Sequence, residues 1–296
     1  MELRKAQRSQ AKLRIGVSSP AGGGKTYSAL VMASGMAPWD KIAVIDTENG
    51  SGEMYSDLGE YNIIPLEAPF SPERYIEAIK ACENAGMEII IIDSISHEWG
   101  GVGGCLEIND ALANAKYRGN SWSAWSETTP RHQNFIDAII SSSCHVITTV
   151  RNKIDTVMTE DKKVKKVGTK EMTREGFEYE LTVNFNIDRD THKVMASKDR
   201  TRLFEELDPF VITAKTGKAL INWMKSGVKV EPKPEPEVVV TSDDVIDYLT
   251  QEGVKMDKMV DYIKETIDMD AKTADPAAMM KALQALKVKV PAKKKK

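Results

Sequence analysis

The chain has 296 residues, of which 41% are hydrophobic and 29% charged, and its formal net charge is −3. This length fits one large α/β domain with a small appendage, and no apolar run approaches the roughly 18 residues that a transmembrane helix needs. Because the net charge is slightly negative, the chain as a whole is not a polycation, and any contact with nucleic acid must come from a local basic patch.

Short β-branched runs alternate with amphipathic stretches from residue 1 to residue 228, and this alternation predicts an α/β core with a mostly parallel sheet. The predicted strands are 13–17, 41–46, 88–93, 145–150, 179–187 and 193–197. Between them the sequence predicts helices at 25–36, 72–85 and 130–141. Two strands, 88–93 and 145–150, are almost entirely apolar, so we expect both of their faces to be buried.

A phosphate-binding loop follows the first predicted strand, where residues 19–26 read S-P-A-G-G-G-K-T. The pattern is Gly-x-x-x-x-Gly-Lys-Ser/Thr, with Ser19 in place of the first glycine. Lys25 would reach the β- and γ-phosphates and Thr26 would offer its hydroxyl to Mg²⁺, so the loop predicts a site for ATP with magnesium. The alternative is a glycine-rich turn without a ligand, which the flanking strand and helix disfavour. The residues predicted to bind nucleotide are Ser19, Gly22, Gly23, Gly24, Lys25, Thr26 and Tyr27.

Acidic residues end two further predicted strands. Four isoleucines place Asp93 at the end of a buried strand, where its carboxylate can hold Mg²⁺. The strand 41–46 ends at Asp46 and is followed two residues later by Glu48. A carboxylate near the γ-phosphate can orient and polarise the attacking water, whereas the alternative interpretation is an acidic turn without a catalytic role.

The runs IAVIDTENG, IIIIDSIS and HVITTVRNK together resemble the RecA-like ATPase core. The resemblance implies that Glu48 activates water and that Asp93 holds magnesium. It places Thr149 where the family has a polar γ-phosphate sensor, often Gln. The run S-K-D-R-T at 197–201 resembles the element whose cations reach the nucleotide of the neighbouring subunit.

Lys198 and Arg200 of that run are therefore expected to be catalytic across a subunit interface. Because they alternate along a predicted strand, their side chains should point to one side of the sheet. The alternative is an ion pairing across strands with Glu178 and Glu180, which also alternate.

The segment R-E-G-F-E-Y-E at 174–180, together with K-D-R-T, resembles the phage-encoded RecA-like ATPases of the single-strand annealing and recombination group. The likeness covers about 12–226. It implies an Mg²⁺-dependent, DNA-stimulated ATPase that assembles as a ring or filament on single-stranded DNA, with a single-strand-binding protein as a further partner. Three scattered cysteines without a CxxC pair indicate reduced thiols, hence a cytoplasmic protein, in the host cytoplasm if it is phage-encoded.

Two segments after predicted strands are expected to be loops that meet DNA. The first, 97–127, is rich in glycine and carries Trp99, Trp122 and Trp125, which can stack on unpaired bases or serve as packing anchors. The second, 151–174, is basic and expected to be disordered until DNA binds, although interleaved acids also fit a solvated loop. The predicted DNA contacts are Arg151, Lys153, Lys162, Lys163, Lys165, Lys166 and Arg174.

The composition changes after residue 228. Residues 229–240 are rich in proline and predict an extended linker, and 241–288 predict a small domain of three short helices before the basic tail 289–296. Asp275 and Pro276 form a good N-cap and first position for the last helix. The apolar residues that predict a small core at helical spacing are Met256, Met259, Val260, Ile263 and Ile267.

Three functions fit these patterns. The first is ATP-dependent binding of single-stranded DNA in recombination or annealing. The second is a ring-shaped DNA motor or helicase loader with the same core. The third is a P-loop small-molecule kinase, which would need an acceptor pocket and an arginine-rich lid that the sequence does not show.

Overall fold

The computed structural model describes residues 5–8, 10–158, 164–228, 242–251, 254–255, 258–271 and 274–287. It gives the backbone alone for 154–158, 164–169, 243–244, 251, 277, 280 and 284–287. The chain divides into two compact units, 1–230 and 231–296. All of the predicted linker 229–240 and of the tail 289–296 lies outside the described residues. Within the described part, no helix is both long and apolar enough to cross a membrane.

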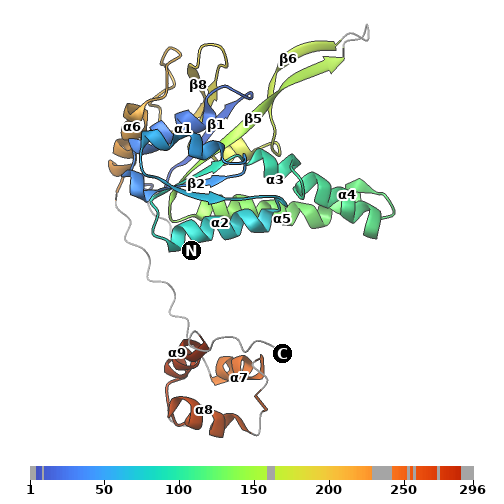
Figure 1. The fold of residues 1–296 in the computed structure, drawn as a ribbon, viewed down its shortest axis with the longest axis vertical. Coiled ribbons are helices and arrows are strands. Elements are labelled where there is room, and N and C mark those ends of the chain that lie inside the picture. Colours follow the sequence, from blue (N-terminus) through green and yellow to red (C-terminus); the bar gives the residue numbers. More distant parts are fainter. Residues whose placement is uncertain are drawn as a thin grey trace. The chain divides into compact units, whose positions relative to one another are not determined.

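The first unit is built on an eight-stranded sheet of order β3-β2-β4-β5-β1-β7-β8, with β6 paired to β5 (Figure 1). Neighbouring strands from β3 to β7 are parallel, whereas β8 runs antiparallel to β7 and β6 antiparallel to β5. This confirms the predicted α/β fold with a mostly parallel sheet. The strands are β1 (Arg14–Ser19), β2 (Ile42–Asp46), β3 (Asn62–Pro65), β4 (Ile89–Asp93), β5 (His145–Met158), β6 (Val164–Glu171), β7 (Val183–Ile187) and β8 (Val194–Asp199).

Helices cover both faces of this sheet. Strand β4 shows why, because Ile89 and Ile91 belong to one hydrophobic core and Ile90 and Ile92 to the other. All four side chains are fully buried, and each contributes about 1.5–3 kcal/mol of transfer free energy. The helices are α1 (Lys25–Ser34), α2 (Pro72–Asn84), α3 (Ser96–Gly100), α4 (Cys105–Lys116), α5 (Ser121–Ser141) and α6 (Ala214–Lys225).

The segment 97–127 is helical, so the expectation of a loop there is wrong. Most of it forms α3, α4 and the first turns of α5, which pack together as an arm beside the sheet (Figure 1). Helix α5 begins well before Pro130 because the Asn120 side chain accepts a hydrogen bond from the Ser123 N–H at 3.1 Å. This N-cap satisfies one of the free donors of the first turn. Pro130 lies inside the helix and does not start it.

The basic segment 151–174 is also more ordered than the sequence suggests. Strand β5 continues to Met158 and pairs with β6 in an antiparallel hairpin that projects from the sheet (Figure 1). The sequence of these strands shows no strict alternation of apolar and polar residues, which explains the wrong expectation of a disordered loop. Lys162 and Lys163 lie outside the described residues. Lys165 and Lys166 pair through their backbones with Val157 and Thr156.

The predicted strand 179–187 begins only at Val183. The preceding residues form a short 3-10 helix, η3 (Phe177–Glu180), after Gly176, whose φ of 97° favours glycine. Phe177 is buried and anchors this turn against the sheet. Glu178 and Glu180 therefore do not alternate along a strand.

The second unit contains α7 (Ser242–Gln251), α8 (Met259–Ile267) and α9 (Pro276–Lys287). Its core joins one pair of buried side chains from each helix: Val245, Leu249, Met259, Ile263, Met279 and Leu283. Asp275 caps α9 by accepting a hydrogen bond from the Ala278 N–H at 3.0 Å. Of the other residues expected in this core, Ile267 is partly buried, Val260 is exposed, and Met256 lies outside the described residues.

Candidate active site

Four neighbouring parallel strands end at one edge of the sheet and bring the predicted nucleotide residues together. Ser19 at the end of β1 lies beside Arg151 of β5, and Asp46 at the end of β2 lies beside Asp93 of β4. In open α/β sheets ligands bind outside the carboxyl ends of the strands. The topology therefore defines a site from segments that are far apart in sequence.

The phosphate-binding loop joins β1 to α1. Gly22 and Gly24 have φ values of 78° and 85°, which other residues rarely adopt. A Cβ on Gly23 would lie 1.7 Å from Oγ of Ser19, so the serine in place of the first glycine fits because residue 23 has no side chain. Lys25 donates from Nζ to the Pro20 carbonyl at 3.2 Å, across the mouth of the loop.

Asp93 lies at the base of this loop. Thr26 donates from Oγ1 to one carboxylate oxygen and Thr149 to the other, both at 2.5 Å. Burial raises the pKa of Asp93, and the two hydroxyl donors oppose that effect by stabilising the charged form. Thr149 thus contacts the predicted magnesium residue, in the place where the resemblance puts a γ-phosphate sensor.

The two acids after β2 have different environments. Asp46 is buried and accepts the backbone N–H groups of Glu48 at 2.7 Å and Gly52 at 3.0 Å, so both of its oxygens shape the turn. The Glu48 side chain points back to the sheet edge and pairs with Arg151, whose Nε and Nη2 both lie 2.9 Å from Oε1. Of the two, Glu48 is the carboxylate that lies beside the phosphate-binding loop.

Arg151 was expected among the DNA contacts, but the structure places it in this site. It lies two residues after Thr149 on β5, so both side chains fall on the same side of the strand. That alternation is the signal that could have assigned it. Burial lowers the pKa of the Lys25 ammonium, the carboxylates of Glu48 and Asp93 raise it, and the charge of Arg151 lowers it further.

Three hydroxyls at these strand ends are buried without a hydrogen-bond partner among the described residues: Ser18, Ser19 and Ser94. Such groups are uncommon in folded proteins and are typically satisfied by a ligand, an ion or water. With Lys25 as the cation and Asp93 as the hard oxygen donor, the residues present fit a triphosphate and Mg²⁺.

Lys198 and Arg200 lie at the opposite edge of the sheet from this loop. Asp199 pairs with Val183 at the start of β7, and Val183 pairs with Ile15 near the start of β1. Both cations donate to the Tyr179 carbonyl, and Lys198 also to the Glu178 carbonyl at 2.8 Å. They share one side, as predicted. None of the described ion pairs joins either cation to the carboxylates of Glu178 or Glu180, although both carboxylates raise the pKa of Lys198 against the lowering effect of its burial. Within the chain the two cations are therefore held mainly by backbone carbonyls.

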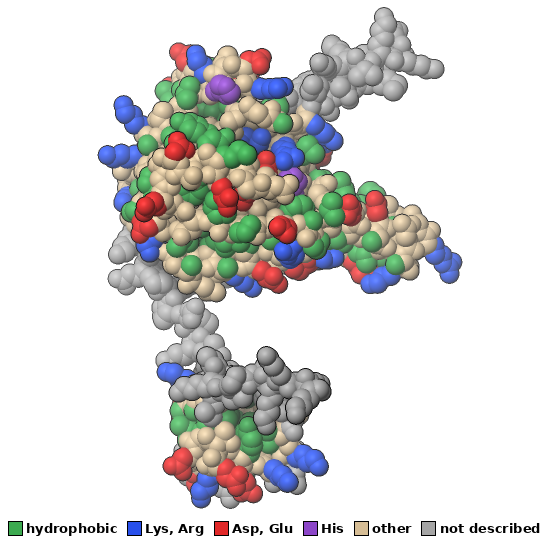
Figure 2. Space-filling view, viewed as in Figure 1, with side chains coloured by type: hydrophobic (Ala, Val, Ile, Leu, Met, Phe, Trp, Pro, Cys, Tyr) green, Lys and Arg blue, Asp and Glu red, His purple; other side chains and the backbone are tan. Residues whose placement is uncertain are grey.

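The remaining predicted DNA contacts with described side chains are Lys153 and Arg174. Lys153 is exposed at the root of the hairpin, and the Arg174 guanidinium lies 5.9 Å from the Trp125 ring centre. On the face drawn in Figure 2, acidic and basic side chains of the first unit are interspersed.

A model of the AAA domain family matches residues 11–216. Among solved structures, an ATPase from the type III secretion system of pathogenic bacteria is similar at 15% identity and a TM-score of 0.36, over 97% of this chain and 87% of that one. No curated protein matches the chain.

Proposed function

The chain belongs to the AAA domain family and is a P-loop ATPase, and we propose that it uses ATP and Mg²⁺ to act on single-stranded DNA in strand annealing or recombination. The observation that carries the nucleotide chemistry is the convergence of Lys25, Asp93 and Glu48 from three separate strand ends. The DNA role rests on the REGFEYE and KDRT resemblance and on the surfaces beside the site.

In this proposal the phosphate-binding loop holds the triphosphate, with Lys25 on the β- and γ-phosphates. Thr26 and Asp93 hold Mg²⁺, which when bound neutralises charge that develops on the phosphates. Glu48 accepts the proton of the attacking water, since Asp93 is assigned to Mg²⁺ and, of the two acids after β2, Asp46 is occupied by backbone N–H groups. Arg151 orients Glu48, and Thr149 orients Asp93.

One strand connects this site to the surface proposed for DNA. Strand β5 carries Thr149 and Arg151 at the site and then Lys153 at the root of the hairpin. A shift of the hairpin on binding DNA would move the two residues that hold Glu48 and Asp93. This continuity supports coupling between DNA binding and hydrolysis.

The proposal includes a homo-oligomer, ring or filament, and a cytoplasmic location with a single-strand-binding protein as a further partner. Lys198 and Arg200 support the oligomer because they lie far from the loop of their own chain. Cations that stabilise the transition state of a neighbouring nucleotide typically raise the rate by about 10³- to 10⁵-fold.

The test is strand annealing. Two complementary single strands should anneal faster with the protein and ATP than with the protein and ADP, and the Lys25→Ala variant should lose this difference. Equal annealing with ATP, ADP and no protein would refute the proposal. ATP-driven unwinding of a tailed duplex would assign the protein to the DNA motors instead.

A further inference from the structure

Three hollows lie end to end beside the root of the β5–β6 hairpin. Their volumes are about 630, 520 and 700 Å³. The first and second share Trp99 and Arg174 among their lining residues, and the second and third share Thr173 and Arg174, so the three hollows adjoin one another. We call these three adjoining hollows the track. Its first hollow also contains Trp122 and Trp125, and its third contains Asn152, Asn184 and Lys198.

The first hollow is an aromatic platform. Trp99 and Trp125 stack with ring centres 5.5 Å apart and an angle of 17° between them. Trp122 lines the same hollow and is 88% exposed. An indole exposed to this extent is unusual for a packing anchor, whereas a flat ring open to solvent is what a stacked base requires.

A buried network holds this platform in place. The His132 ring meets Trp99 edge to face at 5.4 Å, and its Nδ1 lies 3.0 Å from a carboxylate oxygen of Glu98. The Cys105 thiol donates to the same carboxylate at 3.0 Å, and all three of these polar side chains are buried. The network ties α3, α4 and α5 together, so the platform is preorganised for a ligand.

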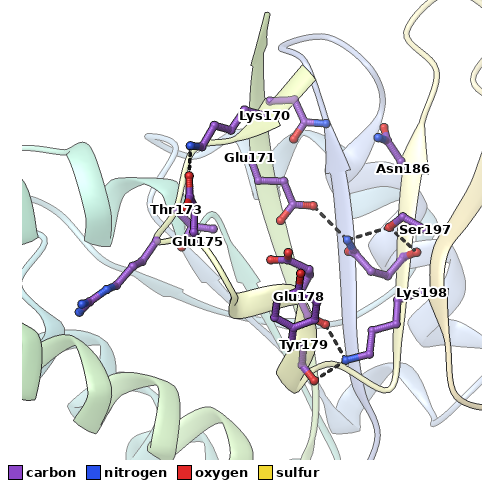
Figure 3. Close-up of a pocket in the computed structure, with 12 residues that line it drawn as sticks. Lys170, Glu171, Thr173, Glu175, Glu178, Tyr179, Asn186, Ser197 and Lys198 are labelled. Carbon is purple, nitrogen blue, oxygen red and sulfur yellow. Dashed lines mark hydrogen bonds and ion pairs between the residues drawn. The ribbon is translucent and has the colours of Figure 1, made fainter. Parts of the chain in front are cut away.

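The third hollow, drawn in Figure 3, is polar. Asn152, Thr173 and Asn184 line it, and each has a buried oxygen without a hydrogen-bond partner among the described residues. The Asn184 amide donates to Glu171 at 3.0 Å and Ser197 at 3.1 Å. These oxygens are shut off from solvent, so a ligand in the hollow would instead meet the carboxylates and amides that line it, such as Glu178 and Asn186, which can accept N–H donors from the edges of nucleobases.

The charge along the track decides between recognition of phosphates and recognition of bases. Its cations are Lys153, Lys170, Arg174 and Lys198, and its carboxylates are Glu171, Glu175 and Glu178. Lys170 forms an ion pair with Glu175, which Figure 3 shows. Because the net charge is close to neutral, phosphates alone would bind weakly, and stacking must supply the affinity.

We propose that the track binds a short run of unpaired bases of single-stranded DNA, with one base stacked on Trp122 and base edges at the Asn152–Asn184 end. The inference rests on the proposed function and names the surface that recognises the DNA. Base pairs in a duplex are already stacked and their edges are paired, so the track selects single strands.

The test measures affinity by fluorescence anisotropy for a labelled thymidine oligonucleotide and for an abasic strand of the same length. Wild type should bind the thymidine strand more tightly. Trp122→Ala should weaken that binding by about 5- to 100-fold, the loss expected for one base–aromatic stack. Trp122→Phe should restore most of it, and Leu207→Ala, which also removes an exposed apolar side chain, should change nothing. Affinity for the abasic strand should be the same in all variants.

Two results would contradict base binding by the track and leave the proposed function intact. One is tight binding of the thymidine strand that does not change in Trp122→Ala. The other is a changed sedimentation coefficient of Trp122→Ala with unchanged DNA affinity, which would make this surface a contact between subunits. A wild-type protein that binds neither strand would instead refute the proposed function itself.

Discussion

The two acids after β2 allow a matched pair of substitutions, Glu48→Gln and Asp46→Asn. Each replaces one carboxylate oxygen by an NH₂ group with almost no change in volume. The structure predicts opposite consequences, because Glu48 faces the nucleotide site and pairs with Arg151, whereas Asp46 is buried and holds the turn through two backbone N–H groups.

The stability effects follow from these contacts. The Glu48–Arg151 pair is partly exposed, with side chains 21% and 36% accessible, so its loss should cost about 0–1 kcal/mol. Asn at position 46 keeps one acceptor oxygen and turns its NH₂ toward a buried N–H donor, which should lower the free energy of unfolding by about 1.5–3 kcal/mol. At about 2–4 °C of Tm per kcal/mol for a unit of this size, Asp46→Asn should lower Tm by about 3–12 °C.

The catalytic effects should be reversed. Glu48→Gln should bind ATP normally and hydrolyse it about 10²- to 10⁴-fold more slowly, because an amide cannot accept the proton of water. Folded Asp46→Asn should retain most of its activity at temperatures below its Tm. Thermal unfolding, equilibrium nucleotide binding and phosphate release on the two variants provide the assay. A Glu48→Gln variant with the wild-type rate, or an Asp46→Asn variant that is stable and inactive, would refute these assignments.

Three further predictions use other parts of the chain. Arg200→Ala and Lys25→Ala should each be inactive, yet a mixture of the two variants should regain ATPase activity. The reason is that each mixed interface of the right order combines an intact phosphate-binding loop with an intact Arg200. If the mixture shows no recovery despite proven co-assembly, Arg200 does not act on the neighbouring subunit's nucleotide. Replacing Lys162, Lys163, Lys165 and Lys166 together by Ala should weaken binding of single-stranded DNA and make its affinity less dependent on salt concentration, because phosphate contacts are lost. If the affinity and its salt dependence do not change, these lysines belong to a solvated charged segment that does not contact DNA. Burial lowers the pKa of His145 to about 3, and its Nδ1 accepts the Leu13 N–H. In the unfolded state the His145 imidazole takes up a proton near pH 6.5, whereas in the folded state it stays neutral. The contribution of His145 to the free energy of unfolding should therefore be intact above that pH and fall by about 1.4 kcal/mol per pH unit below it. His145→Asn should flatten this part of the profile in urea titrations, and a profile that stays steep would assign the acid sensitivity to other groups.

The nucleotide site was largely readable from sequence because its signals are local. A phosphate-binding loop needs glycine at fixed positions, and the four β-branched isoleucines before Asp93 favour a buried strand. The order of the strands in the sheet, which sequence spacing does not reveal, accounts for the Glu48–Arg151 contact. Only the neighbouring positions of β1, β5, β4 and β2 bring Glu48 and Arg151 into contact.

The surfaces beside the site were harder to predict, for two physical reasons. The sequences of β5 beyond Val150 and of β6 lack a strict alternation of apolar and polar residues, so no hydrophobic pattern marks these strands. In the arm of α3, α4 and α5, the glycines suggest a loop and Pro130 suggests the start of a helix, whereas capping by Asn120 and the buried Glu98–His132 contact stabilise helices before it. The Glu98–His132 contact joins residues 34 positions apart, which a local pattern cannot reveal.

We propose that single-stranded DNA controls this ATPase. The most direct measurement is the steady-state rate of ATP hydrolysis with no DNA, with a thymidine homopolymer and with duplex DNA at equal nucleotide concentration, using Glu48→Gln as the background control. The account predicts a rate raised severalfold by the single strand and little by the duplex, and no stimulation in Glu48→Gln. A wild-type rate that is the same in all three conditions would contradict it.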